Sequence, residues 1–370
     1  MEIYSFPYIL LVVFYLVLAI YEHKSKKIKR TRFIAALIFI FFFGFRGYIG
    51  TDWYNYEIYY NNISFRELSF VDKEIGYALL VKLFNLIGVN YLTFVLFLTI
   101  IQVYLWDKFI SKYAISISLS YILIIALFPI LIDLQRNFTS ILIVINALPL
   151  LQKNKKKNYL LMVLIGMLFH ISAAVFIIFI FLKDKIINKK TLVLLLIIGI
   201  IVYTSQVNFY QIALQNLANA LGGYYEKLIM QGVSEDETSY GISFGIIEKF
   251  ALYILLLVLY PRLKKYPPII INCCFVFLLI NFYFSTSQTF INRFAVLFFS
   301  GYILTYGYLL NSLKSRAAFK LALMIVVLFA LLRTYFSYNN VLYRYTNNMI
   351  TVDDISLRSY DRSNYYYFRK

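Results

Sequence analysis

Apolar residues fill this chain in long runs that short polar segments separate. A helix rises 1.5 Å per residue, so crossing about 30 Å of hydrocarbon takes about 20 residues. Eleven runs approach that length: 3–21, 33–45, 91–106, 115–132, 138–151, 159–182, 191–205, 246–260, 269–284, 294–310 and 321–336. The first run has no basic residues before it and no small-residue cleavage site after it, so we expect a membrane span and not a cleaved signal peptide. The pattern predicts an all-α, polytopic membrane helical bundle.

The run 159–182 breaks the simple alternation of sides. A lysine-rich loop precedes it at 152–158 and another follows it at 183–190, and such loops favour the cytoplasmic side. A single crossing would put the two loops on opposite faces. We therefore predict a re-entrant hairpin that enters from the cytoplasm and turns near His170. Non-helical backbone at membrane depth is tolerated only when protein or a water-filled cavity surrounds it, so this hairpin should be buried in the bundle.

The remaining runs give about ten full spans in a single membrane domain, 1–370, with both termini outside. Three sizeable segments should then lie on the outer side: 46–90, 206–245 and 337–370. Within the first, Ile75–Leu86 reads as an amphipathic helix at the outer interface, with Lys82 reaching toward water. The alternative is a short membrane hairpin formed with 91–106. No internal repeat is visible, so an inverted-repeat transporter gains no support.

Composition supports the membrane class and changes the meaning of the charge. The chain is 61% hydrophobic and 15% charged, whereas soluble domains are typically about 45–50% apolar and about 25% charged. The net charge of +18 would suggest nucleic-acid binding in a soluble protein. The six predicted inner loops are 22–32, 107–114, 152–158, 183–190, 261–266 and 311–320. They hold 22 of the 36 basic residues and three of the 18 acidic ones, so they carry +19 and the rest −1. The charge is therefore a topology signal, and we expect no nucleic-acid partner.

Cysteine and histidine counts exclude other classes of protein. Cys273 and Cys274 are adjacent in an apolar run, which makes a poor disulfide. Two Cys and two His offer too few ligands for structural zinc or an iron–sulfur cluster. We predict no cofactor and no metal.

Three arginines on the predicted outer side are not explained by the inward bias of positive charge. Arg46, Arg136 and Arg293 each stand at the outer end of a span, a pattern suited to gripping a membrane-held polyanion such as a lipid diphosphate. A purely structural role stays open for each arginine. Arg46 and Arg293 would then anchor the chain at the membrane interface, and Arg136 would form an ion pair with Asp133. His170 at the predicted turn is either a core histidine or a functional one.

Five short motifs, in order, resemble the EpsG-type branch of the Wzy polysaccharide polymerases over roughly residues 30–310. They are Phe45-Arg46-Gly47…Gly50-Thr51-Asp52…Tyr56, Glu74-Ile75-Gly76-Tyr77-Ala78-Leu79-Leu80, Gln135-Arg136-Asn137, Phe169-His170-Ile171-Ser172-Ala173 and Asn292-Arg293-Phe294. Asn137 departs from the family's pattern, which puts the role of that second amide in doubt but not the role of Arg136.

The resemblance implies a bundle similar to membrane glycosyltransferases of the GT-C type. It implies an enzyme that joins undecaprenyl-diphosphate-linked oligosaccharide repeat units at the outer (periplasmic or extracellular) face of the bacterial inner membrane, for O-antigen, capsule or exopolysaccharide. Partners would then include membrane lipids, a chain-length-regulating protein and a flippase. Glycosyl transfer needs a stabilised leaving group and a base for the acceptor hydroxyl. We assign candidate residues to three roles: diphosphate binding, Arg46, Arg136 and Arg293; catalysis, Asp52, His170 and Arg136; substrate binding, Tyr54, Tyr56, Glu74, Tyr77 and Asn292.

Two choices remain open at this level. The base is Asp52 or His170, and we prefer Asp52 because it lies near Arg46 in sequence on the accessible side. The enzyme is a polymerase or another lipid-linked-sugar glycosyltransferase or ligase, for which paired acids in the first outer loop, here Asp52 and Glu57, give an equivocal sign. A flippase or exporter is less favoured, because charges do not line a central path from both faces.

Overall fold

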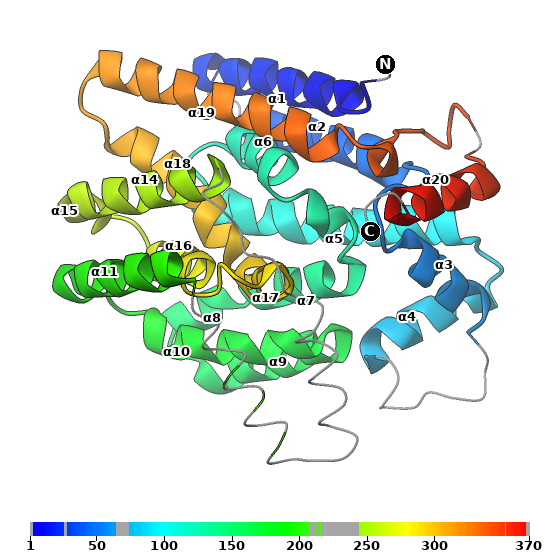
Figure 1. The fold of residues 1–370 in the computed structure, drawn as a ribbon, viewed down its shortest axis with the longest axis horizontal. Helices are drawn as coiled ribbons and strands as arrows, with labels where there is room; N and C mark the ends of the chain where they lie inside the picture. The colour runs from blue at the N-terminus through cyan, green and yellow to red at the C-terminus, as the bar shows by residue number, and fades with distance from the viewer. Residues whose placement is uncertain are drawn as a thin grey trace. The chain divides into compact units, whose positions relative to one another are not determined.

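The structure is a computed structural model, and it describes residues 3–25, 28–63, 74–206, 212, 215, 219, 244–351 and 353–367. These residues are predominantly helical (Figure 1). Their one isolated β-bridge joins Arg46 to Asn347. The predicted all-α class is confirmed, and each of the eleven apolar runs contains a helix. Most of the predicted outer segment 206–245 lies outside the described residues, as does 64–73 within the first.

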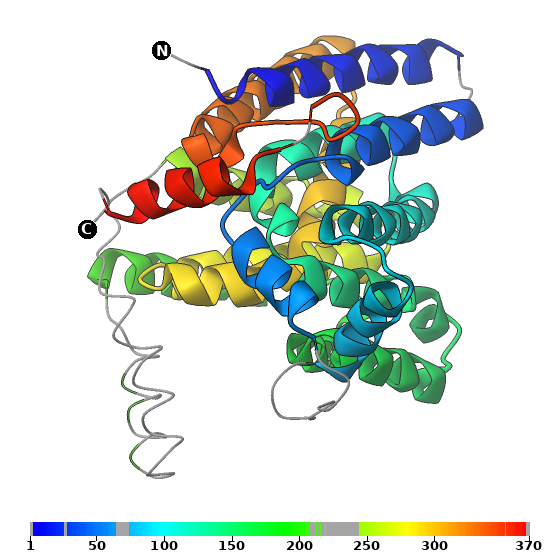
Figure 2. The same cartoon turned by 90° about the vertical axis from the view of Figure 1, so that its right-hand side faces the viewer.

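The described chain divides into two compact units, and the first comprises Met1–Ile177 and Leu313–Lys370. Its helices are α1 (Phe6–Ser25), α2 (Ile28–Phe39), η1 (Ile40–Gly44), α3 (Trp53–Asn61), α4 (Ile75–Leu86), α5 (Tyr91–Tyr113), α6 (Ile117–Leu127), η2 (Pro129–Ile132), α7 (Gln135–Ile145), α8 (Leu148–Gln152), α9 (Lys156–Phe169), η3 (Ile171–Ile178), α19 (Arg316–Tyr338), η5 (Val341–Tyr343) and α20 (Ile355–Tyr367). Helix α1 packs against both α2 and α19 (Figures 1 and 2). Tyr8 of α1 stacks on Tyr338 of α19 at 3.9 Å, which joins the two ends of this unit's sequence.

The second unit, Ile178–Ser312, is built on α16. Its helices are α10 (Phe179–Leu182), α11 (Lys189–Ser205), α14 (Phe244–Val258), α15 (Tyr260–Leu263), α16 (Pro268–Tyr283), α17 (Gln288–Phe294), η4 (Ala295–Phe298) and α18 (Phe299–Ser312). Asn272 of α16 donates to the carbonyls of Leu182 and Lys185, both at 2.8 Å. Cys273 and Cys274 are buried free thiols, as their adjacency predicts.

Four helical segments of the described chain are long and apolar enough to cross a membrane: Phe6–His23, Tyr91–Tyr113, Phe290–Ser312 and Arg316–Tyr338. Several other apolar runs form shorter helices, because local breaks interrupt them. Pro129 follows the end of α6, and Pro149 begins α8. The count of ten spans and the sides of the termini stay predictions.

The predicted hairpin corresponds to a reversal of the chain at His170. Helix α9 ends there, since His170 has extended backbone angles (φ −159°, ψ 127°), and η3 follows. The Tyr159 hydroxyl donates to the Phe176 carbonyl at 2.8 Å, so the two arms run back along each other. The chain therefore reverses direction at His170, while the re-entrant hairpin in a membrane stays a prediction.

Candidate active site

The segment that carries the first motif is held by the C-terminal part of the first unit. The Gly47 amide donates to the Thr346 carbonyl at 3.1 Å, and the Asn348 amide donates to the Phe45 carbonyl at 2.8 Å. The Gly50 amide donates to the Leu342 carbonyl at 2.9 Å. Segments about 300 residues apart thus form one short paired structure, which fixes the backbone that leads into Asp52.

A buried carboxylate fixes the last turn before α3. Asp133 is 6% exposed and accepts from the Thr51 amide at 2.8 Å and the Asp52 amide at 3.3 Å. Gly50 has φ +93°, and a Cβ there would lie 2.0 Å from Asp133 Oδ1, so only glycine fits. Burial, with the nearby charge of Asp52, raises the pKa of Asp133 to about 7. Asp133 thus holds the loop, and it is not the partner that Arg136 uses.

Arg46 is buried within the same paired segments, 45–52 and 342–348 with Asp133, which together we call the frame. Its side chain is 7% exposed, and its guanidinium donates to the carbonyls of Phe43 and Ile132 and to the Thr99 hydroxyl. These acceptors belong to the protein and tie the first motif to η2 and α5. The predicted diphosphate-binding role of Arg46 stays a prediction, and the contacts show a residue already occupied by backbone carbonyls.

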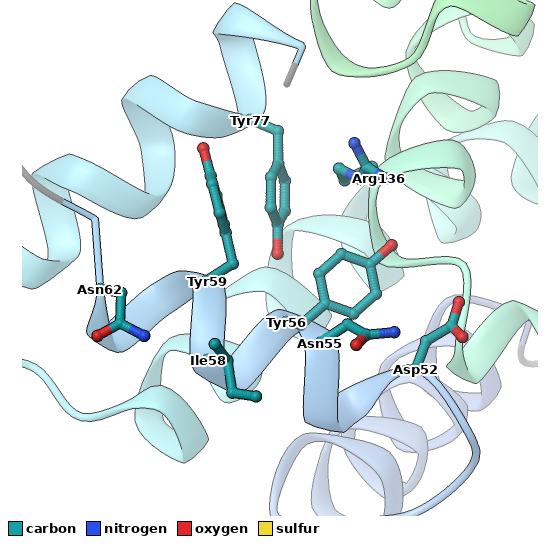
Figure 3. A pocket seen from close by; sticks show the side chains of 8 residues that line it. All are labelled: Asp52, Asn55, Tyr56, Ile58, Tyr59, Asn62, Tyr77 and Arg136. Carbon is teal, nitrogen blue, oxygen red and sulfur yellow. The ribbon is translucent and has the colours of Figure 1, made fainter. Parts of the chain in front are cut away.

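A cavity of about 500 Å³ opens among α3, α4 and α7 (Figure 3). Its lining combines aromatic rings, amides, one carboxylate and one guanidinium: Asp52, Asn55, Tyr56, Ile58, Tyr59, Asn62, Tyr77 and Arg136. The Tyr59 and Tyr77 rings lie nearly parallel, 20° apart, with centroids separated by 6.4 Å. The Arg136 guanidinium lies 5.7 Å from the Tyr56 ring centroid and 6.0 Å from that of Tyr77. Flat rings and one cation therefore face the same space.

Asp52 is the carboxylate of this cavity. Burial raises its pKa above the ordinary carboxyl value, while the hydrogen bond from Thr51 and the charges of Arg136 and Arg362 oppose that rise. Arg362 belongs to α20 and also donates to the Thr51 carbonyl at 3.1 Å. The carboxylate thus lies between two cations that come from distant parts of the chain.

Behind the lining, Arg136 pairs with the carboxylate of Glu74. Glu74 Oε1 lies 3.9 Å from His170 Nε2. The Ser172 amide donates to His170 Nδ1 at 3.2 Å, and the Ser172 hydroxyl donates to Asn137 Oδ1 at 3.1 Å. Asn137, whose departure from the family pattern left its role in doubt, therefore takes part in the hydrogen bonding around His170.

Tyr77 is fixed by the residue that precedes Arg136. The Tyr77 hydroxyl donates to Gln135 Oε1 at 3.1 Å, and Gln135 Nε2 donates to the Tyr91 hydroxyl at 3.0 Å. Gln102 in turn donates to the Gln135 carbonyl at 3.2 Å. The second and third motifs are thereby joined below the cavity floor.

The structure thus brings six of the predicted site residues together in the first unit. Four line the cavity and two lie behind it: Asp52, Tyr56, Tyr77 and Arg136, then Glu74 and His170. Tyr54 points elsewhere on α3, where Arg362 lies 5.0 Å from its ring centroid. Asn292 and Arg293 belong to α17 of the second unit, so their share in one site with Arg136 stays a prediction.

Sequence reasoning missed two groups of residues. The first continues one face of α3 and consists of Asn55, Ile58 and Asn62. Positions 52, 55, 59 and 62 are three or four residues apart, so helical periodicity starting at Asp52 carries the signal. The second is Arg362, for which no local pattern exists, because its relation to Asp52 arises from pairing between distant segments.

Comparison with known proteins identifies a family. The model of the EpsG family matches residues 29–348 of this chain. No curated protein and no solved structure matches it significantly, and the expected likeness to the GT-C type stays a prediction. The matched range includes each of the five motifs and stops before α20. Since the match covers well over half of its length, the chain belongs to the EpsG family.

Proposed function

We propose that this protein is a polysaccharide polymerase that joins undecaprenyl-diphosphate-linked oligosaccharide repeat units at the outer face of a bacterial inner membrane. Membership of the EpsG family and the apolar helices support a membrane protein of polysaccharide biosynthesis. The observation that carries the proposal is the convergence of Asp52, Tyr77 and Arg136, from three separate motifs, on one cavity of about 500 Å³.

The reaction requires a cation at the leaving group, and Arg136 is suited to it. The bond between the anomeric carbon of the growing chain and its lipid diphosphate breaks, and the diphosphate leaves with the electron pair. Arg136 Nη1 pairs with Glu74, whereas Nε is buried and makes no hydrogen bond within the described structure. A phosphate group accepts two parallel N–H donors from one guanidinium, so it would use the donor that Glu74 leaves unpaired.

Asp52 is suited to the other half of the reaction. As the acceptor hydroxyl oxygen bonds to the anomeric carbon, its proton passes to the Asp52 carboxylate. The pKa of Asp52 is raised by burial, which makes it a stronger base than an exposed aspartate. Tyr56, Tyr59 and Tyr77 offer flat faces on which sugar rings can pack and from which water is excluded.

The proposal extends to features that the first unit alone does not carry. Arg293 and Asn292 of α17 would contact the diphosphate or the sugar of the incoming unit, and Arg46 would support the diphosphate of the growing chain through the frame.

No step of the proposed reaction calls for a metal, so turnover should persist in the presence of a chelator. A cysteine label placed at position 189 should report the cytoplasmic side, and an outward label would overturn the proposed re-entrant topology.

Deletion and complementation test the function. Cells lacking the gene should make surface glycan as single repeat units without the ladder of longer chains, and the wild-type gene should restore the ladder. Complete loss of surface glycan would instead indicate a flippase. A ladder that persists without the gene would overturn the polymerase proposal. A purified protein that transfers one sugar block to a lipid other than a diphosphate carrier would indicate a ligase.

A further inference from the structure

The cation of the cavity is occupied by a carboxylate of the protein itself. Glu74 and Arg136 form an ion pair in which the side chains are 17% and 23% exposed. The bond uses Nη1 of Arg136, and the buried Nε has no hydrogen-bond partner among the described residues. Glu74 therefore neutralises the charge of Arg136 but leaves one of its N–H donors without an acceptor. A ligand with several phosphate oxygens would neutralise the charge and also accept from more of these donors.

The packing of two helix ends places Glu74 beside a second side chain that can donate to its carboxylate, His170. Glu74 precedes α4 and makes no hydrogen bond to cap that helix. Gly76 approaches α9 so closely that a Cβ there would lie 2.9 Å from both the Cβ and the carbonyl oxygen of Leu168. The start of α4 thus contacts the end of α9, which brings Glu74 next to His170.

The hydrogen bonding of His170 orients its ring toward Glu74. The Ser172 hydroxyl, at 2.8 Å, and the Ser172 amide, at 3.2 Å, both contact His170 Nδ1 and hold the ring in place. In the neutral tautomer that accepts the amide at Nδ1, the proton is on Nε2, the atom that lies 3.9 Å from Glu74 Oε1. That separation is longer than a hydrogen bond, and a shift of about 1 Å would form one.

We propose that Glu74 is a displaceable counter-ion that moves from Arg136 to His170 when a diphosphate enters the cavity. The proposal rests on the function proposed above and adds the step by which the site accepts its charged substrate. Without ligand, Glu74 neutralises Arg136 and keeps that cation from other anions. With ligand, phosphate oxygens take Nη1 and Nη2 of Arg136, which displaces Glu74 from Nη1. Glu74 then accepts a hydrogen bond from Nε2–H of His170. No covalent bond changes in this exchange.

Binding of a short lipid diphosphate, farnesyl diphosphate, to the full-length protein in detergent tests the exchange by calorimetry. Glu74→Gln removes the competing charge, so its Kd should fall about fivefold to tenfold, the value of a partly exposed ion pair. His170→Gln removes the new partner of Glu74, so its Kd should rise. In the double variant the His170 substitution should have no further effect, because the displaced carboxylate is gone.

Glu57→Gln is the matched control. Glu57 is a partly buried carboxylate on the same helix as the lining residues, and it accepts from Asn61 at 2.6 Å rather than from Arg136. Its substitution removes the same charge and should leave the Kd within about twofold, because Glu57 does not pair with Arg136. If Glu74→Gln and Glu57→Gln tighten binding equally, a general electrostatic effect replaces the proposed exchange.

A spectroscopic measurement keeps the proposal testable if a Glu74 variant folds poorly. The chain has two histidines, so His23→Gln leaves His170 as a single reporter for ¹³C-histidine NMR. Its signal should shift when farnesyl diphosphate is added, and Arg136→Ala should abolish that shift. An unchanged His170 signal in a protein that binds the ligand would overturn the exchange alone. If the wild-type protein binds no lipid diphosphate at all, the proposed function is overturned instead.

Discussion

Arg46 and Arg136 come from two motifs of the same unit and have opposite surroundings. Arg46 is 7% exposed, and its guanidinium is committed to the carbonyls of Phe43 and Ile132 and to a threonine hydroxyl. Arg136 is 23% exposed in its side chain, lines the cavity and pairs with a single carboxylate. The first region is a frame of fixed backbone acceptors. The second is a binding surface with a donor left over.

The difference shows that residue type and outer position do not by themselves define a ligand site. Backbone carbonyls around Arg46 cannot leave, because each belongs to a helix end or turn that packing holds. The carboxylate on Arg136 belongs to the residue just before α4 and has a second partner within reach in His170. An arginine is available to a substrate when its protein partner can be exchanged, and that condition separates the two.

The largest expected effect is on turnover at Arg136. Arg136→Ala should lower polymerisation by about 10²–10³-fold, since a preorganised cation at the leaving group acts mainly in the transition state. The melting temperature should change little, because the residue lies at a cavity wall. Arg136→Lys, which keeps the charge but loses the planar fork, should retain part of the activity. A wild-type glycan ladder from Arg136→Ala at normal expression would contradict the assignment.

Asp52→Asn should lower turnover by about 10²-fold, which is typical for loss of a general base. In the wild type, the rate should rise with pH through the pKa of Asp52, because the ionised carboxylate is the active form. That pKa lies above the ordinary carboxyl range owing to burial. The rise should be absent in Asp52→Asn, measured as turnover against pH. Persistence of the same acid limb would move the base to another group, with His170 as the next candidate.

Arg46→Ala should act on stability. Removing the side chain leaves buried carbonyls without donors, at a cost of about 2–4 kcal/mol in the free energy of unfolding. Thermal unfolding in detergent measures this effect, and the protein that remains folded should still bind farnesyl diphosphate. The contrast between a structural Arg46 and a ligand-binding Arg136 would be wrong if Arg46→Ala kept the wild-type melting temperature and lost lipid-diphosphate binding. Arg46 would then contact the substrate, as the sequence alone suggests.

The smallest effect concerns Asp133, which holds the same frame. Its pKa is raised to about 7 by burial and by Asp52. A carboxyl with a raised pKa in the folded state contributes stability that is complete below its ordinary pKa and is lost as pH rises through about 7. Asp133→Asn keeps an oxygen for the Thr51 amide and does not titrate. Relative to wild type, its unfolding free energy should therefore gain about 1–2 kcal/mol between pH 5 and pH 8. Parallel pH profiles for the two proteins would contradict this.

Patterns that depend on neighbours in sequence predicted most of the helices and part of the site. Hydropathy found a helix in every apolar run, and α4 occupies the predicted Ile75–Leu86. Charge on both sides of 159–182 predicts a re-entrant hairpin; the chain does reverse at His170, and its entry into a membrane stays a prediction. Asp52, Tyr56 and Glu74 were assigned from motifs, and the structure sets them around Arg136.

The remainder depends on contacts that no local pattern records. Pro129 and Asn146 shorten apolar runs, and Asn146 does so while donating to the Leu105 carbonyl of another helix at 2.8 Å. The burial of Arg46 follows from where η2 packs, and the place of Arg362 follows from its bond to Thr51. Such features require the fold first, since a single sequence carries no trace of which distant segments meet.

The pairing of the first motif with residues 342–348 has a consequence for biosynthesis. A chain leaves the ribosome N-terminus first, and helices near its start can enter the membrane while the rest is still being made. The amides of Gly47 and Gly50, however, donate to Thr346 and Leu342. The loop before Asp52 can therefore settle fully only after these residues have been translated. A ribosome stalled before that point would hold an inserted but inactive intermediate, so activity should appear late and abruptly during synthesis.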